Sequence, residues 1–357
     1  MLYTCDSNLK PIALSGRSDR ASGKYTQFAV DVHCHVFVPE AAKFVGDAFD
    51  PDMDDLFKYA NEATRDVNAA QAETIHEPLT SIERRISDMD EMGIDVQAVS
   101  PAPLQYYYSL DPELARDASR MINDHIAGMC DAYPDRLVGL ANVPMQSPEL
   151  AIAELERAVK ELNFRGVEIS TNVAGRELSD KAFWPFFKKA EELDALVFMH
   201  PCGFSHGDRL CDHYFTNVIG NPLDTSIAVQ HMIFSGLMDE CSKLKVCLAH
   251  GGGYITAYSG RIDHAHGARA DCRRCISEPP TSYLKRMYFD TIVFTHHQLE
   301  YLVQQYGADR IVIGTDYPYD MGMYEPVDFV NQANLSDEDK ELIVGTNAAK
   351  LLNINIK

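Results

Sequence analysis

The sequence predicts an α/β fold, a (β/α)8 TIM barrel with a long insertion after its first strand. From residue 27 onward, short runs rich in Val, Ile, Leu and Phe alternate with longer amphipathic stretches. This alternation is typical of βα units on a parallel sheet, and the eight runs match the strand number of a TIM barrel. An open doubly wound sheet is the alternative, but the first run lacks the glycine-rich phosphate turn of that fold.

Each strand is predicted from one apolar run. In chain order the runs are Phe28–Phe37, Asp95–Pro101, Leu137–Pro144, Gly166–Thr171, Ala195–Pro201, Lys245–His250, Met287–Val293 and Ile311–Pro318. Between them lie stretches such as 148–162, where apolar residues recur every three or four positions and charged residues occupy the other face. These stretches predict the helices that connect successive strands.

Three segments depart from this alternation. Residues 1–26 are polar and are predicted to form an N-terminal arm, so that the barrel domain spans 27–357. The insertion at about 40–81 is far longer than an ordinary βα loop, and we expect it either to cover a site or to form a subunit contact. Ser336, a capping residue before an acidic first turn, predicts a terminal helix that ends at about Leu352.

The composition argues against several classes of partner. The chain has 53 acidic and 32 basic residues and a formal net charge of −21, which repels phosphate backbones and anionic membrane surfaces. We therefore expect no nucleic-acid partner and no membrane partner. The first thirty residues lack the apolar region of a signal peptide, so a cytoplasmic location is expected. Cys272 and Cys275 form a lone CxxC, which we interpret as part of a surface loop.

Imidazole and carboxylate groups end four of the predicted strands. His33 and His35 end the first strand, where the two-residue period points both side chains to the same side. His200, His250 and Asp316 end the fifth, sixth and eighth strands. Because C-terminal strand ends converge at the mouth of a barrel, a shared divalent cation would satisfy all of these polar groups. Nitrogen and carboxylate donors favour zinc, with manganese or iron as alternatives.

A second HxH pair, His264 and His266, is not assigned to the metal. It lies in a predicted helical stretch, where residues two apart point in different directions. A single histidine at a strand end is more often a hydrogen-bonded core residue than a ligand. The metal hypothesis therefore depends on the number of strand ends that carry such groups.

Several segments resemble the amidohydrolase superfamily, namely Asp31-Val-His-Cys-His, Phe198-Met-His-Pro, Cys247-Leu-Ala-His-Gly-Gly-Gly and Ile313-Gly-Thr-Asp-Tyr-Pro. Three others are similar to the family of 2-amino-3-carboxymuconate-6-semialdehyde decarboxylase, namely Arg85–Ile94, Val143–Ala151 and Gly260–Ile262. The resemblance extends from about Ala29 to Leu352. It implies a metal-dependent decarboxylase on a TIM barrel.

By position, the resemblance implies that His33, His35, His200 and Asp316 hold one zinc ion, with manganese possible, and that a water occupies the remaining position. It implies that His250 hydrogen-bonds this water and takes part in proton transfer, with Asp316 as the second candidate for proton delivery. A neutral imidazole can accept and return a proton close to neutral pH.

The resemblance also concerns the substrate carboxylate and the assembly. Arg261 matches a family arginine that reaches the substrate across a dimer interface, which implies a homodimer. The family's second substrate arginine falls within the insertion, where Arg65 is the candidate although its neighbours differ from the family context. Residues 202–205 also depart from the family. We therefore expect a carboxylated ring or dienoic acid other than the aminocarboxymuconate semialdehyde.

The sequence thus predicts a zinc-dependent, non-oxidative decarboxylase that acts on an aromatic or muconate-like carboxylic acid. An alternative keeps the site but assigns it metal-assisted hydrolysis or hydration of a C–C bond, lactone or amide. A barrel scaffold or metal-buffering protein is a third interpretation. It is disfavoured because closed structural zinc sites carry no spare histidine beside an open position.

Overall fold

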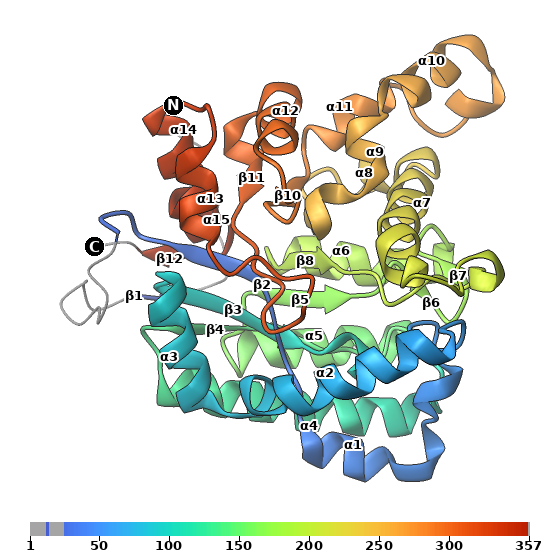
Figure 1. Ribbon diagram of the computed structural model, residues 1–357. Helices are drawn as coiled ribbons and strands as arrows, with labels where there is room; N and C mark the ends of the chain where they lie inside the picture. Colours follow the sequence, from blue (N-terminus) through green and yellow to red (C-terminus); the bar gives the residue numbers. More distant parts are fainter. Residues whose placement is uncertain (1–11, 14–24, 356–357) are drawn as a thin grey trace.

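Eight parallel strands form the central sheet of the computed structural model, which describes residues 12–13 and 25–355 (Figure 1). In spatial order they are β2 (Val30–Val36), β3 (Val96–Pro101), β4 (Leu137–Ala141), β5 (Gly166–Ile169), β8 (Leu196–Met199), β9 (Lys245–Leu248), β10 (Tyr288–Asp290) and β11 (Ile311–Val312). Parallel bridges pair Asp31 with Ile313 and Cys34 with Tyr317, so the last strand meets the first. The sheet is therefore a nearly closed barrel, as predicted.

Helices follow the strands around the outside of this barrel (Figure 1). The longer ones are α3 (Ile82–Met92), α4 (Pro112–Ala132), α5 (Pro148–Lys160), α6 (Trp184–Glu192), α7 (Asn221–Phe234), α10 (Gly260–Ala268) and α12 (His296–Tyr306). Shorter ones are α8 (Leu237–Glu240), α9 (Tyr254–Ala257), α11 (Pro280–Leu284) and α13 (Pro326–Gln332). Two small strand pairs lie outside the barrel, β6 (Asn172–Val173) with β7 (Arg176–Glu177), and β1 (Ile12–Ala13) with β12 (Ile354–Asn355).

The predicted terminal helix is confirmed as a continuous helical segment made of α14 (Asp337–Glu341), a π-helical turn (Leu342–Thr346) and α15 (Asn347–Leu351). Ser336 caps it, because its side chain accepts the backbone N–H of Asp339. Most of the predicted N-terminal arm lies outside the described residues.

Each of the eight predicted runs contains one barrel strand, but several strands are shorter than their runs. The clearest case is β11, which ends at Val312 although the run extends to Pro318. Asp316 has a φ of +55°, in the left-handed region that an extended strand cannot contain. The chain leaves the sheet before Asp316 and returns to it at the bridge between Tyr317 and Cys34.

A buried arginine fixes the end of the first strand. Arg85, the first residue of one family-like segment, is 1% exposed and donates to the Gln97 side chain at 3.0 Å and to the backbone carbonyl of His35. Its guanidinium also lies 5.0 Å from the ring centroid of Tyr317. Arg85 therefore links α3 to the strand that carries both histidines.

The insertion folds into α1 (Pro39–Val45), short 3-10 turns and α2 (Glu62–Thr80). Asn61 caps α2 by accepting the backbone N–H of Thr64 at 2.9 Å, and Ser81 caps α3 in the same way through Arg84 at 3.2 Å. Side-chain caps at Asn61 and Ser81 thus fix where α2 and α3 begin.

Two further expectations concern the surface. Cys272 and Cys275 are free thiols in a short segment after α10, as expected for a surface loop. Within the described residues, no helix combines the length and the apolar character needed to cross a lipid bilayer.

Candidate metal centre

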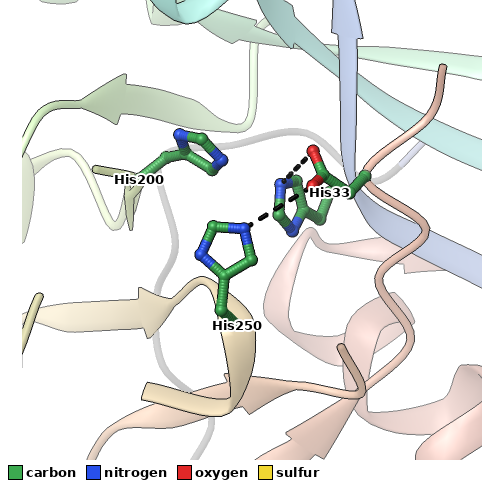
Figure 2. A group of neighbouring side chains, drawn as sticks. His33, His200 and His250 are labelled. Carbon is green, nitrogen blue, oxygen red and sulfur yellow. Dashed lines mark ion pairs between the residues drawn. The ribbon is translucent and has the colours of Figure 1, made fainter. Parts of the chain in front are cut away.

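Four imidazoles gather around the carboxylate of Asp316 at the C-terminal ends of the strands. The Nε2 atoms of His33 and His35 each lie 3.2 Å from its Oδ1, and Nε2 of His250 lies 3.6 Å from its Oδ2. The His200 ring centroid is 4.9 Å from those of His33, His35 and His250. Figure 2 shows the rings of His33, His200 and His250 turned toward one another. The five predicted side chains therefore meet.

The facing nitrogens of this cluster are buried and, apart from the ion-pair contacts to Asp316, have no hydrogen-bond partner among the described residues. They are Nε2 of His33, Nε2 of His35 and both ring nitrogens of His200. Leaving buried polar atoms unpaired is costly, so clustered unpaired nitrogens indicate a ligand-binding site. Imidazole nitrogens beside a carboxylate are donors for zinc and related transition metals. The residues present thus fit a divalent cation.

A side-chain carboxylate and a backbone carbonyl orient the two histidines of the first strand. His33 directs its Nδ1 to Oδ2 of Asp290 at 2.6 Å, and His35 directs its Nδ1 to the carbonyl of Pro101 at 3.1 Å. A hydrogen bond at Nδ1 fixes that nitrogen as the N–H donor and leaves Nε2 free for a metal. Both rings are therefore prepared as ligands by their surroundings.

Asp290, at the end of β10, joins this orienting contact to the loop that carries His250. Its Oδ2 also accepts the backbone N–H of His250 at 2.9 Å, and its Oδ1 accepts those of Gly251 at 2.8 Å and Ile292 at 3.1 Å. Asp290 is fully buried. One carboxylate thus positions a candidate metal ligand and the candidate proton-transfer residue together.

The electrostatics of the cluster favour a positive charge at its centre. Burial opposes protonation of His33, but Asp316 and Asp290 outweigh it and raise the pKa of His33 to about 10. Burial raises the pKa of Asp316, yet His33 and the other imidazoles outweigh this effect and hold it well below its usual value. Burial and the neighbouring imidazoles lower the pKa of His200 well below its usual value. A divalent cation would supply the charge that the two carboxylates attract.

Both His250 and Asp316 have unusual backbone conformations, with φ values of +55°. Non-glycine residues rarely adopt this region, and it occurs at functional sites where the surrounding structure enforces it. For His250, the enforcing contacts are those of Asp290 to the backbone of the loop. Gly251, with a φ of +59°, follows directly and supports the same tight turn.

A cavity of about 240 Å³ opens beside the cluster. His200, His250 and Asp316 line it on the barrel side, and α2 lines it with positions 68, 71, 72, 75, 76, 79 and 80, which share one helical face. The insertion therefore lines the cavity beside the candidate metal centre, which agrees with the expectation that it covers a site. A role of this segment in a subunit contact stays a prediction.

The two predicted substrate arginines lie outside this cavity. Arg65 is held within the insertion, where it pairs with Asp52 and donates to the carbonyls of Ala60 at 3.0 Å and Phe57 at 2.8 Å. Arg261 is exposed near the start of α10, which projects at the upper right of Figure 1. Their substrate-binding roles stay predictions. His264 and His266 lie on α10, which confirms that this pair belongs to a helix.

Two buried acids of the site were not predicted. Asp290 is the last residue of β10 but lies inside the predicted run Met287–Val293, so the strand-end rule missed it because the run was drawn three residues too long. Glu168 lies within β5, 3.8 Å from Nδ1 of His35, and accepts the Tyr106 hydroxyl. Burial raises the pKa of Glu168. No pattern in the sequence distinguished this glutamate from a surface acid.

The sequence model of the amidohydrolase family matches residues 30–354 of the chain. A 2-amino-3-carboxymuconate-6-semialdehyde decarboxylase from Dictyostelium discoideum is 34% identical over 273 residues, which cover 76% of each protein. The chain belongs to the amidohydrolase superfamily, in the family of this decarboxylase. The resemblance seen in the sequence is confirmed, and the chain is a metal-dependent carboxy-lyase of this superfamily.

Solved structures of family members agree with this assignment. A 5-carboxyvanillate decarboxylase from Sphingomonas paucimobilis superimposes with a TM-score of 0.83 and 25% identity, covering 92% of this chain and all of that chain. A dihydroxybenzoic acid decarboxylase from Polaromonas sp. JS666, solved with manganese and the inhibitor 2-nitroresorcinol, gives a TM-score of 0.77 at 25% identity, covering 92% and 97%. A divalent metal is therefore supported for this chain, and the Asp316 cluster is its candidate site.

Proposed function

We propose that this enzyme removes a carboxylate as carbon dioxide, without an oxidant, from an aromatic or muconate-like carboxylic acid. The observation that carries the proposal is the group of buried imidazole nitrogens around Asp316 that have no hydrogen-bond partner within residues 25–355. This group lies beside a cavity large enough to admit a ligand. The decarboxylases similar to this chain support the reaction type.

His33, His35, His200 and Asp316 are the proposed ligands of one divalent cation. The ligand atoms of His33, His200, His250 and Asp316 all lie within 4.8 Å of one another, which makes His250 a rival to His35. We prefer His35 because it is fully buried and its hydrogen bond to Pro101 leaves Nε2 directed inward. The side chain of His250 is 17% exposed and lines the cavity, where it can reach a substrate.

The donor set favours zinc, since three imidazoles with one carboxylate form a common zinc site. Manganese is the alternative, and the manganese-bound relative supports it. When bound, such a cation polarises the oxygens of a substrate and draws negative charge toward itself. Metal analysis of the purified protein by mass spectrometry, followed by activity of the apoprotein reloaded with each metal, distinguishes the two.

Side chains of this protein then transfer the proton to the substrate. A proton from His250 is added to the carbon that carries the carboxylate, which places a new C–H bond on that carbon. Asp316 is the second candidate, but its low pKa means that it must first accept the proton from the substrate or from His250 before it delivers it. Cleavage of the C–C bond returns its electron pair to the ring and releases carbon dioxide. The donor recovers a proton from solvent, so the overall reaction consumes one proton for each carboxylate removed.

Replacing His250 by alanine tests this assignment. We expect the His250→Ala variant to bind metal with near-normal stoichiometry and to lose carbon dioxide release from substrates such as 2,6-dihydroxybenzoate and 5-carboxyvanillate. His297→Ala is the matched control, because His297 is 98% exposed on α12. Near-normal turnover in the His250 variant would refute its role. A product of hydrolysis or hydration, with no carbon dioxide, would favour the alternative reaction.

Arg261 is proposed to serve the site of a second copy in a homodimer. Its exposure near the start of α10 and its absence from the described lining of its own cavity agree with a role across an interface. The neighbouring Tyr258 is 69% exposed, which leaves an apolar side chain available for such a contact. Sedimentation analysis should find a dimer, and Arg261→Ala should raise KM more than it lowers kcat. A monomer with full activity would exclude this arrangement.

A further inference from the structure

Two thiols outside the metal centre have no role in the proposed decarboxylation. Cys272 and Cys275 lie between α10, which projects at the upper right of Figure 1, and α11. Cys275 is exposed, Cys272 is half-buried, and both are free. They form a CxxC pair, the spacing used by disulfide oxidoreductases.

The backbone of this segment brings the two thiols close together. Cys272 lies in a 3-10 turn (Asp271–Arg273), and Arg274 continues it with helical dihedral angles, φ −69° and ψ −37°. Residues three apart in such a turn lie one above the other, with about 5–6 Å between their Cβ atoms. A disulfide needs about 3.5–4.5 Å between them. A small backbone adjustment therefore permits an S–S bond.

Both sides of the pair are attached to the rest of the protein. Arg273, between the two cysteines, donates to the backbone carbonyls of His266 at 3.0 Å and Gly267 at 2.9 Å in the last turn of α10. Ile276, directly after Cys275, is 5% exposed and belongs to the hydrophobic core. These contacts restrict the segment, which reduces the conformational entropy lost when the thiols join.

A zinc site is the other chemistry that a CxxC pair can serve, but it needs further ligands. Within residues 12–13 and 25–355, the group of three or more histidine, cysteine or acidic side chains close enough to share a cation is the one around Asp316. No third ligand joins Cys272 and Cys275 in this part of the chain. The pair therefore favours thiol–disulfide chemistry.

We propose that Cys272 and Cys275 form a reversible disulfide by exchange with a low-molecular-weight disulfide such as glutathione disulfide. The thiolate of the exposed Cys275 attacks one sulfur of glutathione disulfide, which forms a mixed disulfide and releases one glutathione. The Cys272 thiolate then attacks the Cys275 sulfur and releases the second glutathione. The protein loses two electrons and two protons, and these reduce one glutathione disulfide to two glutathione molecules.

Peptide mapping reads this bond directly, because trypsin cleaves after Arg273 and Arg274, between the two cysteines. The reduced, manganese-loaded protein is equilibrated with mixtures of glutathione and glutathione disulfide, quenched with acid, alkylated and digested. We expect mass spectrometry to find residues 270–273 linked to residues 275–285. The linked pair should increase with the proportion of glutathione disulfide and disappear in excess glutathione.

Serine variants test the two roles. Cys272→Ser lacks the second thiol, so the glutathione adduct at Cys275 should accumulate to about tenfold above its level in the wild type. Cys275→Ser should react about tenfold more slowly, because its remaining thiol is half-buried. Cys211→Ser is the control, because Cys211 is another partly buried thiol in a different loop, and it should leave the linked pair unchanged.

Each other outcome overturns the proposal. Absence of the linked pair in a large excess of glutathione disulfide shows that the bond does not form, and a link that persists in excess glutathione shows that it is not reversible. A non-reducing denaturing gel shows whether the link joins two chains, which would also contradict it. Equal adduct levels in Cys272→Ser and the wild type would show that the two thiols do not exchange with each other.

Discussion

Replacing Asp290 by asparagine should weaken metal binding without unfolding the protein. Asp290 accepts four hydrogen bonds, two at each carboxylate oxygen. Asparagine has one oxygen, which can keep the pair from Gly251 and Ile292. Its NH2 group then faces His33 Nδ1 and the backbone N–H of His250, where an acceptor is required.

The expected loss of metal affinity follows from these contacts. The bond lost at His33 involves a charged carboxylate, and such bonds contribute about 1.5–3 kcal/mol, or roughly 10- to 150-fold in an equilibrium constant. The new N–H donor also favours the His33 tautomer with its proton on Nε2, which blocks that nitrogen as a ligand. We therefore expect the metal dissociation constant of Asp290→Asn to rise about 10- to 100-fold.

Chelator competition with zinc and with manganese measures this dissociation constant. Asp95→Asn is the control, because Asp95 is a buried carboxylate that accepts the backbone N–H of Ala29 at 2.7 Å, before β2 and β3 begin. Circular dichroism checks that both variants are folded. A folded Asp290 variant whose metal affinity lies within about twofold of the wild type would refute the orienting role.

Three other substitutions test the fold and the site. Arg85→Lys cannot keep both bonds of the guanidinium, including that to the His35 carbonyl, so the free energy of unfolding in urea should fall by about 2 kcal/mol; an unchanged midpoint would contradict this. Gly314→Ala adds a Cβ that meets the His33 Cβ at 2.9 Å, and chelator competition should find weaker metal binding, whereas wild-type affinity would show that the site adapts. Burial raises the pKa of Asp224 in the native protein above its ordinary value of 3.8. As the pH rises past 3.8, the unfolded chain loses this proton before the native protein does, so the free energy of unfolding falls. Asp224→Asn has no carboxyl group to ionise, so its free energy of unfolding in urea, relative to that of the wild type, should increase from pH 4 to pH 7. A difference between the two proteins that stays constant with pH would contradict this prediction.

The barrel could be predicted because its strands are short, apolar and regularly spaced. The same regularity located the metal centre, since a side chain at a strand end must lie at the barrel mouth whatever the details of the loops. His200 and Asp316 were found in this way although they are far apart in the sequence. Strand ends were less predictable, because the left-handed backbone at Asp316 depends on the packing around it.

Features that depend on tertiary contacts could not be predicted. The partners of Asp290 include backbone N–H groups of the loop at His250, and they meet only when β9 and β10 pair. The helical cap at Asn61 marks where α2 begins but not which surface it covers. Arg65 resembled a substrate ligand in sequence, yet it is held by backbone carbonyls of the insertion itself.

The central claim is that four side chains, from the ends of two strands and from one loop, bind a single divalent cation. Anomalous diffraction at the manganese edge, on crystals of the manganese-loaded protein, tests it most directly. The account predicts one strong peak bonded to His33, His35, His200 and Asp316, with His250 nearby but not bonded. A peak bonded to His250 in place of His35, or no peak within this cluster, would contradict it.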